Sequence, residues 1–150
     1  MELPDIRTLV PHAGPMVLID RVVSADEENL CAELRIRPES LFCVNGTVGS
    51  WVGIEYMAQA IGAWAGYTAR LRGEPVKRGF LLGTRRYECV RPCFPVGALL
   101  RIHVRRLFQE ANGLASFECR IEDESGVIGS GNLAVFQSTE PAEFSEQVSA

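Results

Sequence analysis

The residues best suited to chemistry lie in one long apolar stretch of the sequence. Between residues 49 and 66 the chain reads "GSWVGIEYMAQAIGAWAG", in which Glu55 is the one acid and Gln59 the one side-chain amide. Four residues apart on a helix, these side chains share a face, so the amide could hold the carboxylate in place. A buried acid favours its protonated form, which suits proton transfer. We therefore predict that Glu55 is a general acid or base.

A structural role is the alternative for Glu55, because acids in a first helical turn stabilise the helix dipole. No Lys or Arg lies between Pro38 and Thr68, so the sequence offers no local ion pair. The segment "NGTVGSWVG", which ends at Gly53, supplies backbone N–H groups at the helix start that could polarise a substrate carbonyl. Together with the apolar surroundings, this favours a catalytic interpretation.

One long helix and two groups of strands must position these residues. The apolar and small residues fall on every face of the helix, so it should be surrounded, and its glycines should allow close approach of other backbone. Strands before and after one helix predict an α+β fold with a curved antiparallel sheet around it. The strands are expected at 16–25, 30–37, 79–90, 98–109, 114–123 and 127–137, and the helix at 50–71. Residues 138–150 are predicted to be a flexible acidic tail.

Composition and charge exclude several classes of protein. No apolar run reaches the roughly 20 residues of a membrane span, and no nucleic-acid-binding motif is present. Five cysteines without an export signal predict reduced thiols and a cytoplasmic location. The histidines are His12 and His103, too few near Cys89 and Cys93 for a metal site. Net charge is −4, but residues 70–106 hold ten Lys/Arg against two acids. That segment could attract an acidic partner or simply solvate an outer sheet face.

Three passages of the sequence resemble the motifs of a known protein family. "LVPHAGPMVLIDRV" is similar to an opening Leu-Pro-His, Pro and Asp-Arg-Val pattern, and "GIEYMAQA" to a central-helix Glu-Ala-Met-Ala-Gln motif. "GFLLGTRRYECVRPCFPVGALL" is similar to a third strand with its Pro-Gly turn. From Leu9 to about Leu100 the chain thus resembles the hotdog-fold 3-hydroxyacyl-acyl-carrier-protein dehydratases of fatty acid synthesis. Its motifs look most similar to the dehydratase-like proteins of aryl polyene gene clusters.

The resemblance implies a hotdog fold, with a six-stranded antiparallel sheet wrapped around one long central helix in a single domain of residues 1–137. It implies a dimer, either a homodimer or a heterodimer with a second hotdog protein. The acyl substrate would arrive on the phosphopantetheine of an acidic acyl carrier protein or on CoA, and no cofactor or metal is expected. Glu55 matches the catalytic carboxylate and Gln59 a glutamine one turn later. Gly49, Ser50 and Gly53 lie where substrate-binding amides are expected.

The sequence departs from the family at the catalytic histidine. A Gly-His-Phe-Pro-Gly motif normally precedes the helix, whereas this chain reads "LFCVNGTVGSWVG" there. His12 is therefore a candidate catalytic residue, or a partner protein supplies the missing group.

Three functions remain open on the sequence. The first is dehydration of a 3-hydroxyacyl thioester to a trans-2-enoyl product, with Glu55 and His12 dividing the proton transfers. The second is an acyl thioesterase, in which a helical carboxylate activates water. The third is a non-catalytic hotdog subunit that completes the site of a partner dehydratase.

Overall fold

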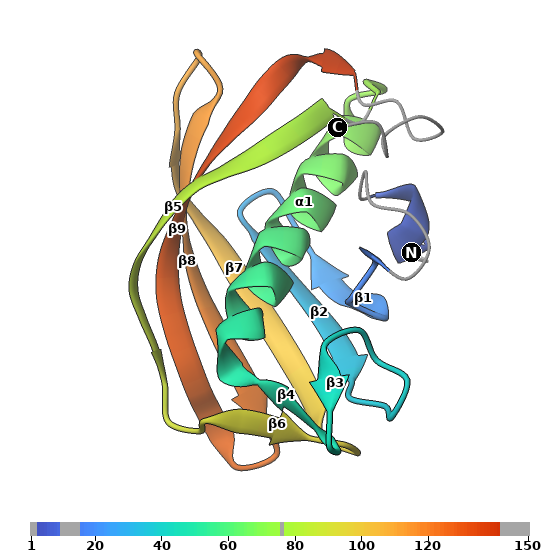
Figure 1. The fold of residues 1–150 in the computed structure, drawn as a ribbon. Coiled ribbons are helices and arrows are strands. Elements are labelled where there is room, and N and C mark those ends of the chain that lie inside the picture. Colours follow the sequence, from blue (N-terminus) through green and yellow to red (C-terminus); the bar gives the residue numbers. More distant parts are fainter. Residues whose placement is uncertain (1–2, 10–15, 76, 142–150) are drawn as a thin grey trace.

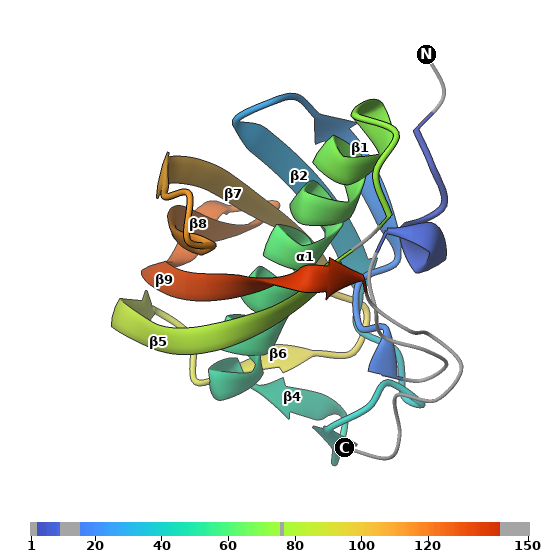
Figure 2. The ribbon, with the colours of Figure 1, turned by 90° about the horizontal axis from the view of Figure 1, so that it is seen from above.

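A computed structural model describes residues 3–9, 16–75 and 77–141 of the 150-residue chain. One long helix, α1, lies against the concave side of a curved sheet (Figure 1). The view from above shows the strands bending around the helix (Figure 2). The elements are η1 (Ile6–Thr8), β1 (Arg21–Ala25), β2 (Asn29–Arg35), β3 (Cys43–Val44), β4 (Thr47–Gly49), η3 (Ser50–Val52), α1 (Gly53–Leu71), β5 (Lys77–Cys89), β6 (Cys93–Pro95), β7 (Leu99–Gln109), β8 (Leu114–Asp123) and β9 (Gly126–Pro141).

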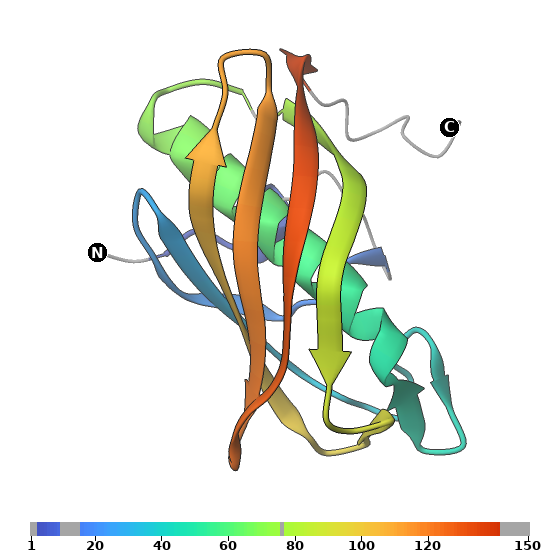
Figure 3. The ribbon, with the colours of Figure 1, turned by 90° about the vertical axis from the view of Figure 1, so that its left-hand side faces the viewer.

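The main sheet has six antiparallel strands in the order β1-β2-β7-β8-β9-β5. This confirms the predicted α+β hotdog architecture. Strands β7, β8, β9 and β5 lie side by side in front of the helix when the outer face is viewed (Figure 3). In the part of the chain that the structure describes, β5 pairs with β9 alone, so it forms one edge of the sheet.

A second, three-stranded sheet of β3, β4 and β6 was not predicted. Its β3–β4 hairpin turns at Asn45 and Gly46, which both have positive φ (54° and 78°), as a two-residue hairpin requires. Its strands are only two or three residues long, too short for an alternating pattern to be visible in the sequence. This small sheet leads directly into η3 and α1, and so sets where the helix begins.

The predicted helix over residues 50–71 is confirmed, with a 3-10 turn (Ser50–Val52) ahead of the α-helix. As expected, a glycine allows close approach of other backbone. A Cβ added at Gly66 would collide with the main chain of Leu9, which packs on this side of the helix. Leu9 is fully buried, as are the helix residues Met57, Ala60 and Ala63. The helix is therefore held between the N-terminal segment and the sheet.

The observed strand boundaries differ from the predicted ones mainly in the first and the last strand of the chain. The first strand begins at Arg21 rather than residue 16, because the preceding main chain bonds to a helix side chain described below. The last strand, β9, runs to Pro141 beside Lys77, four residues beyond the domain end expected at residue 137. Residues 142–150 of the expected flexible tail lie outside the described residues.

Acidic side chains of the sheet form ion pairs with several arginines of the basic segment of residues 70–106. Arg101 pairs with Glu33 at 3.3 Å, and Arg105 pairs with Glu118 at 3.1 Å. Arg91 likewise pairs with Asp123 at 3.0 Å. Acids from neighbouring strands thus satisfy these arginines, which favours the interpretation that they solvate a sheet face. Among the described residues, no helix is long and apolar enough to cross a membrane.

Replacing Gly66 with Val tests the close contact between the helix and Leu9. The added side chain has to displace main chain, so we expect the free energy of unfolding to fall by about 1–3 kcal/mol. The measurement is chemical denaturation. Thr68→Ser, which keeps the hydrogen bond from this hydroxyl to the Ala65 carbonyl (3.0 Å) at a half-buried position of the same helix, is the control. Equal stability of the two variants would contradict the contact.

Candidate active site

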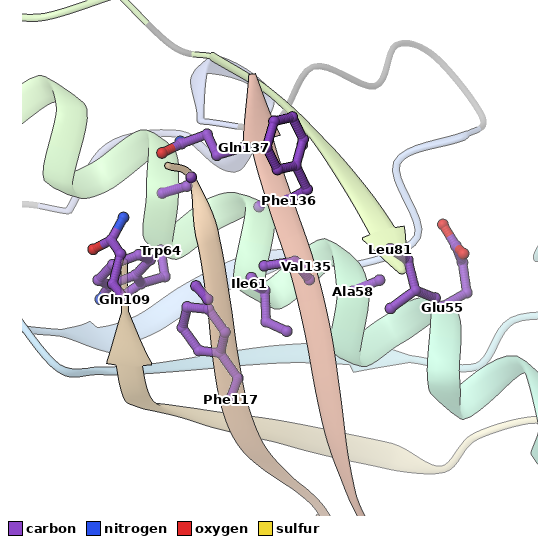
Figure 4. Close-up of a pocket in the computed structure, with 15 residues that line it drawn as sticks. Glu55, Ala58, Ile61, Trp64, Leu81, Gln109, Phe117, Val135, Phe136 and Gln137 are labelled. Atoms are coloured by element: carbon purple, nitrogen blue, oxygen red, sulfur yellow. The ribbon is translucent and has the colours of Figure 1, made fainter. Parts of the chain in front are cut away.

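A cavity of about 280 Å³ runs along one side of α1, between the helix and the strands β5, β8 and β9. Figure 4 shows its lining side chains in a row, with Glu55 at one end and Trp64 and Gln109 at the other. Most of the lining is aliphatic or aromatic. The described lining residues are Glu55, Ala58, Ile61, Gly62, Trp64, Ala65, Gly79, Leu81, Gln109, Gly113, Ala115, Phe117, Val135, Phe136 and Gln137. Of these, Glu55 is the only ionisable residue.

Glu55 stands in the first turn of α1, near the positive end of the helix dipole. Its side chain lies beside Leu81 at the end of the row in Figure 4. The residue is half-buried, whereas the sequence suggested an acid enclosed on all sides. A carboxylate here can reach both the apolar cavity and molecules entering from outside. This is a suitable position for exchanging a proton with a bound chain.

Gln59 is fully buried and does a different task from the one predicted. Its Oε1 accepts a hydrogen bond from the Leu18 N–H at 2.8 Å, and its Nε2 donates to the Met16 carbonyl at 2.6 Å. Both ends of the amide are therefore engaged by the main chain ahead of β1. The amide therefore fastens that segment to the helix. The sequence had instead suggested that it would hold the Glu55 carboxylate. A substrate contact for Gln59 stays a prediction.

The amides expected to polarise a carbonyl are partly used inside the chain. The Ser50 N–H donates to the Pro92 carbonyl at 3.0 Å, and the Gly53 N–H is bonded to the carbonyls of Ser50 and Trp51. Gly49 precedes the 3-10 turn, and a Cβ there would lie 2.5 Å from Trp51 Nε1. By the geometry of a 3-10 turn that begins at Ser50, the turn itself leaves the Trp51 N–H unused.

Tyr87 is a residue of the site that sequence reasoning missed. Its hydroxyl donates to the Ser50 carbonyl at 2.5 Å and packs where a Cβ of Gly53 would otherwise lie. Burial raises the pKa of Tyr87 well above its ordinary value, so it stays a neutral donor. A bulge in β5, where Arg86 has a φ of 55°, turns this tyrosine inward. Nothing in "TRRYECV" marks a bulge, so the contact was invisible in the sequence.

The structure describes His103 but not His12. His12, the candidate catalytic residue, lies outside the described residues. His103 lies on β7, and its Nε2 is 3.2 Å from Glu122 Oε1 and 3.8 Å from Cys31 Sγ. Burial lowers the pKa of His103. Its partners belong to β2 and β8 on the outer face of the sheet, so His103 is no candidate for the cavity.

Within the ranges that the structure describes, no three His, Cys, Asp or Glu side chains are grouped as metal ligands. All five cysteines are free, and Cys31 and Cys119 are buried. Burial raises the pKa of Cys119 far above its usual range, so it remains a neutral thiol. The expectation that the protein works without metal or cofactor stays a prediction.

Comparison with known proteins agrees with this architecture. The model of the ApeP-like family, which is described as "ApeP dehydratase", matches residues 4–146 of this chain. The chain belongs to the ApeP-like family. The dehydratase heterocomplex ApeI:P from Xenorhabdus doucetiae contains a similar chain, 29% identical, with a TM-score of 0.87 over 93% of this chain and 94% of that one.

Two further relatives differ in what they show. The 3-hydroxyacyl-[acyl-carrier-protein] dehydratase FabZ of Bartonella quintana (strain Toulouse) is 26% identical over 140 residues, covering 89% of this chain and 88% of the relative. A hypothetical thioesterase with coenzyme A from Streptococcus pneumoniae is 10% identical, with a TM-score of 0.63 over 81% of this chain and 87% of its own. That likeness shows the fold alone.

These findings confirm the predicted family and the aryl polyene branch. The protein is a hotdog dehydratase-like lyase of the 3-hydroxyacyl-acyl-carrier-protein type, as in fatty acid or aryl polyene synthesis.

Replacing Gln59 with Leu tests its fastening role. The change leaves the Leu18 N–H and the Met16 carbonyl without their partner in a partly buried place. We expect the free energy of unfolding to fall by roughly 2–4 kcal/mol, since each unsatisfied buried group costs about 1–3 kcal/mol. The measurement is a denaturant melt of both proteins. An unchanged melt with lost turnover would assign Gln59 to the substrate instead.

Proposed function

We propose that Glu55 exchanges a proton with the substrate in the dehydration of a 3-hydroxyacyl thioester. One group removes a proton from carbon 2, and another protonates the hydroxyl that leaves carbon 3 as water. The product is the trans-2-enoyl thioester. The observation that supports this role is the position of Glu55, the one ionisable residue among the described lining of an apolar cavity. A low-polarity site of this kind strengthens the electrostatic interactions within it.

The negative charge that develops on the thioester oxygen needs a donor. We assign this role to the Trp51 N–H, since the Ser50 N–H is bonded to Pro92 and the Gly53 N–H to the preceding turn. The dipole of α1 adds favourable potential at the same end. Tyr87 keeps the entrance in place through its bond to Ser50 and its packing on Gly53.

The second proton-transfer group must come from outside the described cavity lining. His12 is one candidate, and a second hotdog subunit is the other. We propose that a second subunit completes the site, because the similar chain in the ApeI:P structure belongs to a heterocomplex. The long edge strand β5 offers a surface for that subunit, since Leu81 and Leu82 are 41% and 59% exposed. A long, apolar edge strand invites pairing with another chain.

The proposal includes an acyl carrier protein as the donor of the substrate, on its phosphopantetheine arm. Exposed arginines from the basic segment, such as Arg70 and Arg85, could attract an acidic carrier. It also includes a cytoplasmic location, because the five cysteines are free and such thiols persist in a reducing compartment.

Replacing Glu55 with Gln tests the proton transfer. We expect kcat to fall by roughly 10²–10⁴-fold, the usual contribution of one acid–base group. The assay follows the enoyl thioester formed from 3-hydroxyacyl carrier, with the chain alone and with its hotdog partner. The matched control is Glu28→Gln, at an exposed glutamate in the turn before β2, which should keep the wild-type rate. A rate unchanged by Glu55→Gln removes this residue from the mechanism.

Replacing Leu82 with Lys tests the β5 edge as the subunit contact. A buried unpaired lysine is costly, so the dissociation constant of the dimer should rise at least about tenfold, or ~1.4 kcal/mol. Sedimentation equilibrium provides the measurement. Val127→Lys is the control, because Val127 is 57% exposed, almost as Leu82 is, but lies at the start of β9. Equal dimerisation of both variants would place the contact elsewhere.

A further inference from the structure

The 3-10 turn ahead of α1 is held by hydrogen bonds at both ends of Ser50. The Ser50 N–H donates to the Pro92 carbonyl at 3.0 Å. The Ser50 carbonyl accepts two hydrogen bonds, one from the Gly53 N–H and one from the Tyr87 hydroxyl at 2.5 Å. A carbonyl oxygen has two lone pairs, so both are used. Closing the turn requires only the bond from Gly53, and the second bond therefore serves another purpose.

Three elements of the fold make room for the Tyr87 hydroxyl at this turn. In β5, Arg86 adopts a φ of 55°, which is uncommon for a residue other than glycine, and the bulge there turns Tyr87 inward. At the start of α1, Gly53 lacks the Cβ that would collide with the hydroxyl. In β9, a Cβ added at Gly131 would lie 3.4 Å from Tyr87 Cδ1. The position of the hydroxyl is thus built into the helix and both strands.

The Ser50 carbonyl and the Trp51 N–H belong to the same peptide unit. Because a trans peptide is planar, its C=O and N–H point in opposite directions, and fixing one fixes the other. Hydrogen bonds in a chain also polarise one another, which strengthens each by roughly 10–30%. A bond accepted by the Ser50 carbonyl therefore orients the Trp51 N–H and makes it a stronger donor.

Tyr87 acts on this peptide from outside the cavity. It is not among the described residues that line the cavity, and its proton is engaged by Ser50. Burial raises the pKa of Tyr87 well above its ordinary value, so the hydroxyl keeps its proton at neutral pH. A neutral group adds no charge near the Glu55 carboxylate. These observations favour an effect through the main chain over direct contact with a substrate.

We propose that Tyr87 is a positioning residue that orients and polarises the Ser50–Trp51 peptide, so that the Trp51 N–H donates more strongly to the thioester oxygen. The inference rests on the proposed function for one point only, the Trp51 N–H as that donor. Negative charge grows on the thioester oxygen in the transition state, where a fixed and polarised donor stabilises it most. The Tyr87 hydroxyl therefore raises kcat and has little effect on KM.

Tyr87→Phe tests the proposal, because it removes the hydroxyl and keeps the ring beside Gly53. In the complex of the full chain with its hotdog partner, kcat should fall by about 5–30-fold, less than the roughly 10²–10³-fold loss of a direct donor. KM should change by less than about twofold. The pH profile should keep its shape, because the tyrosine stays protonated. The Gly53 N–H still satisfies the Ser50 carbonyl, so the melting temperature should move by no more than about 4 °C.

Tyr56→Phe is the matched control. It removes a tyrosine hydroxyl from the same end of α1, at a residue that is 2% exposed and packs on Phe94. This variant should keep the wild-type kcat, since its ring lies against Phe94 and the bond to Ser50 comes from Tyr87. An equal loss of kcat in both variants would show a general effect of removing buried hydroxyl groups and would contradict the proposal.

Infrared spectroscopy measures the strength of the donor directly. The probe is a butanoyl thioester of pantetheine labelled with ¹³C at its carbonyl, which lacks a 3-hydroxyl group and cannot be dehydrated. Its carbonyl band should lie at a lower wavenumber on the wild-type complex than on Tyr87→Phe, because a stronger donor weakens the C=O bond. The same difference should persist when Tyr87→Phe is made in the Glu55→Gln background.

Gly53→Ala removes the bond in a second way, because the added Cβ collides with the Tyr87 hydroxyl. Ile121 Cδ1, 2.7 Å from the same Cβ, is the end of a flexible side chain and can move aside. Gly53→Ala should lower kcat about as much as Tyr87→Phe does. The double variant should lose little more than either single variant, because both changes remove one interaction. Losses that multiply in the double variant would contradict the proposal.

The outcomes separate this inference from the proton role of Glu55. If Tyr87→Phe keeps the wild-type kcat, or lowers kcat without moving the carbonyl band, Tyr87 does not act through the Trp51 N–H. If the band moves as expected while Glu55→Gln keeps full turnover, the positioning role stands and the proton role of Glu55 fails. If turnover depends on Glu55 while Tyr87→Phe changes neither kcat nor the band, the reverse holds.

Discussion

The structure depends on how helix α1 is held inside a curved sheet. Its larger residues pack against the strands, while the buried Gln59 amide binds the main chain at Met16 and Leu18, and Gly66 admits Leu9. These contacts fix the side of the helix that faces the N-terminal segment of the chain. The side towards β5 and β9 carries small residues and keeps a cavity. Because the same helix bears Glu55 in its first turn, the position of the acid relative to the cavity follows from this packing.

The sequence was sufficient for the architecture because its patterns are long. The helix over 50–71 and the strand over 114–123 were predicted to within a few residues, since periodicity and turn residues bound them clearly. The β3–β4 hairpin was missed because its strands are too short to show a period. The inward turn of Tyr87 was missed because a bulge depends on the pairing of two strands, which local sequence does not record.

Predictions for the site were less complete than those for the fold. Glu55 was identified from its chemical isolation in an apolar stretch, and the structure places it at the end of an apolar cavity. Gln59 carries the same isolation signal, yet its amide is engaged by main chain. An isolated polar residue therefore marks either a reacting group or a buried fastening. Only the hydrogen-bond partners distinguish these two cases. The partners of Gln59 lie about forty positions away in the sequence. The Ser50 amide was likewise used by a segment distant in sequence.

A structure of the chain with its hotdog partner and an unreactive 3-hydroxyacyl pantetheine amide would test the central claim most directly. The account predicts that the acyl tail lies between α1 and strands β5 and β9, with carbon 2 or the 3-hydroxyl within hydrogen-bonding reach of Glu55. An acyl chain bound wholly within the partner, with Glu55 of this chain distant from it, would contradict the claim. The fold and the fastening role of Gln59 would survive that result, whereas the catalytic role of Glu55 would not.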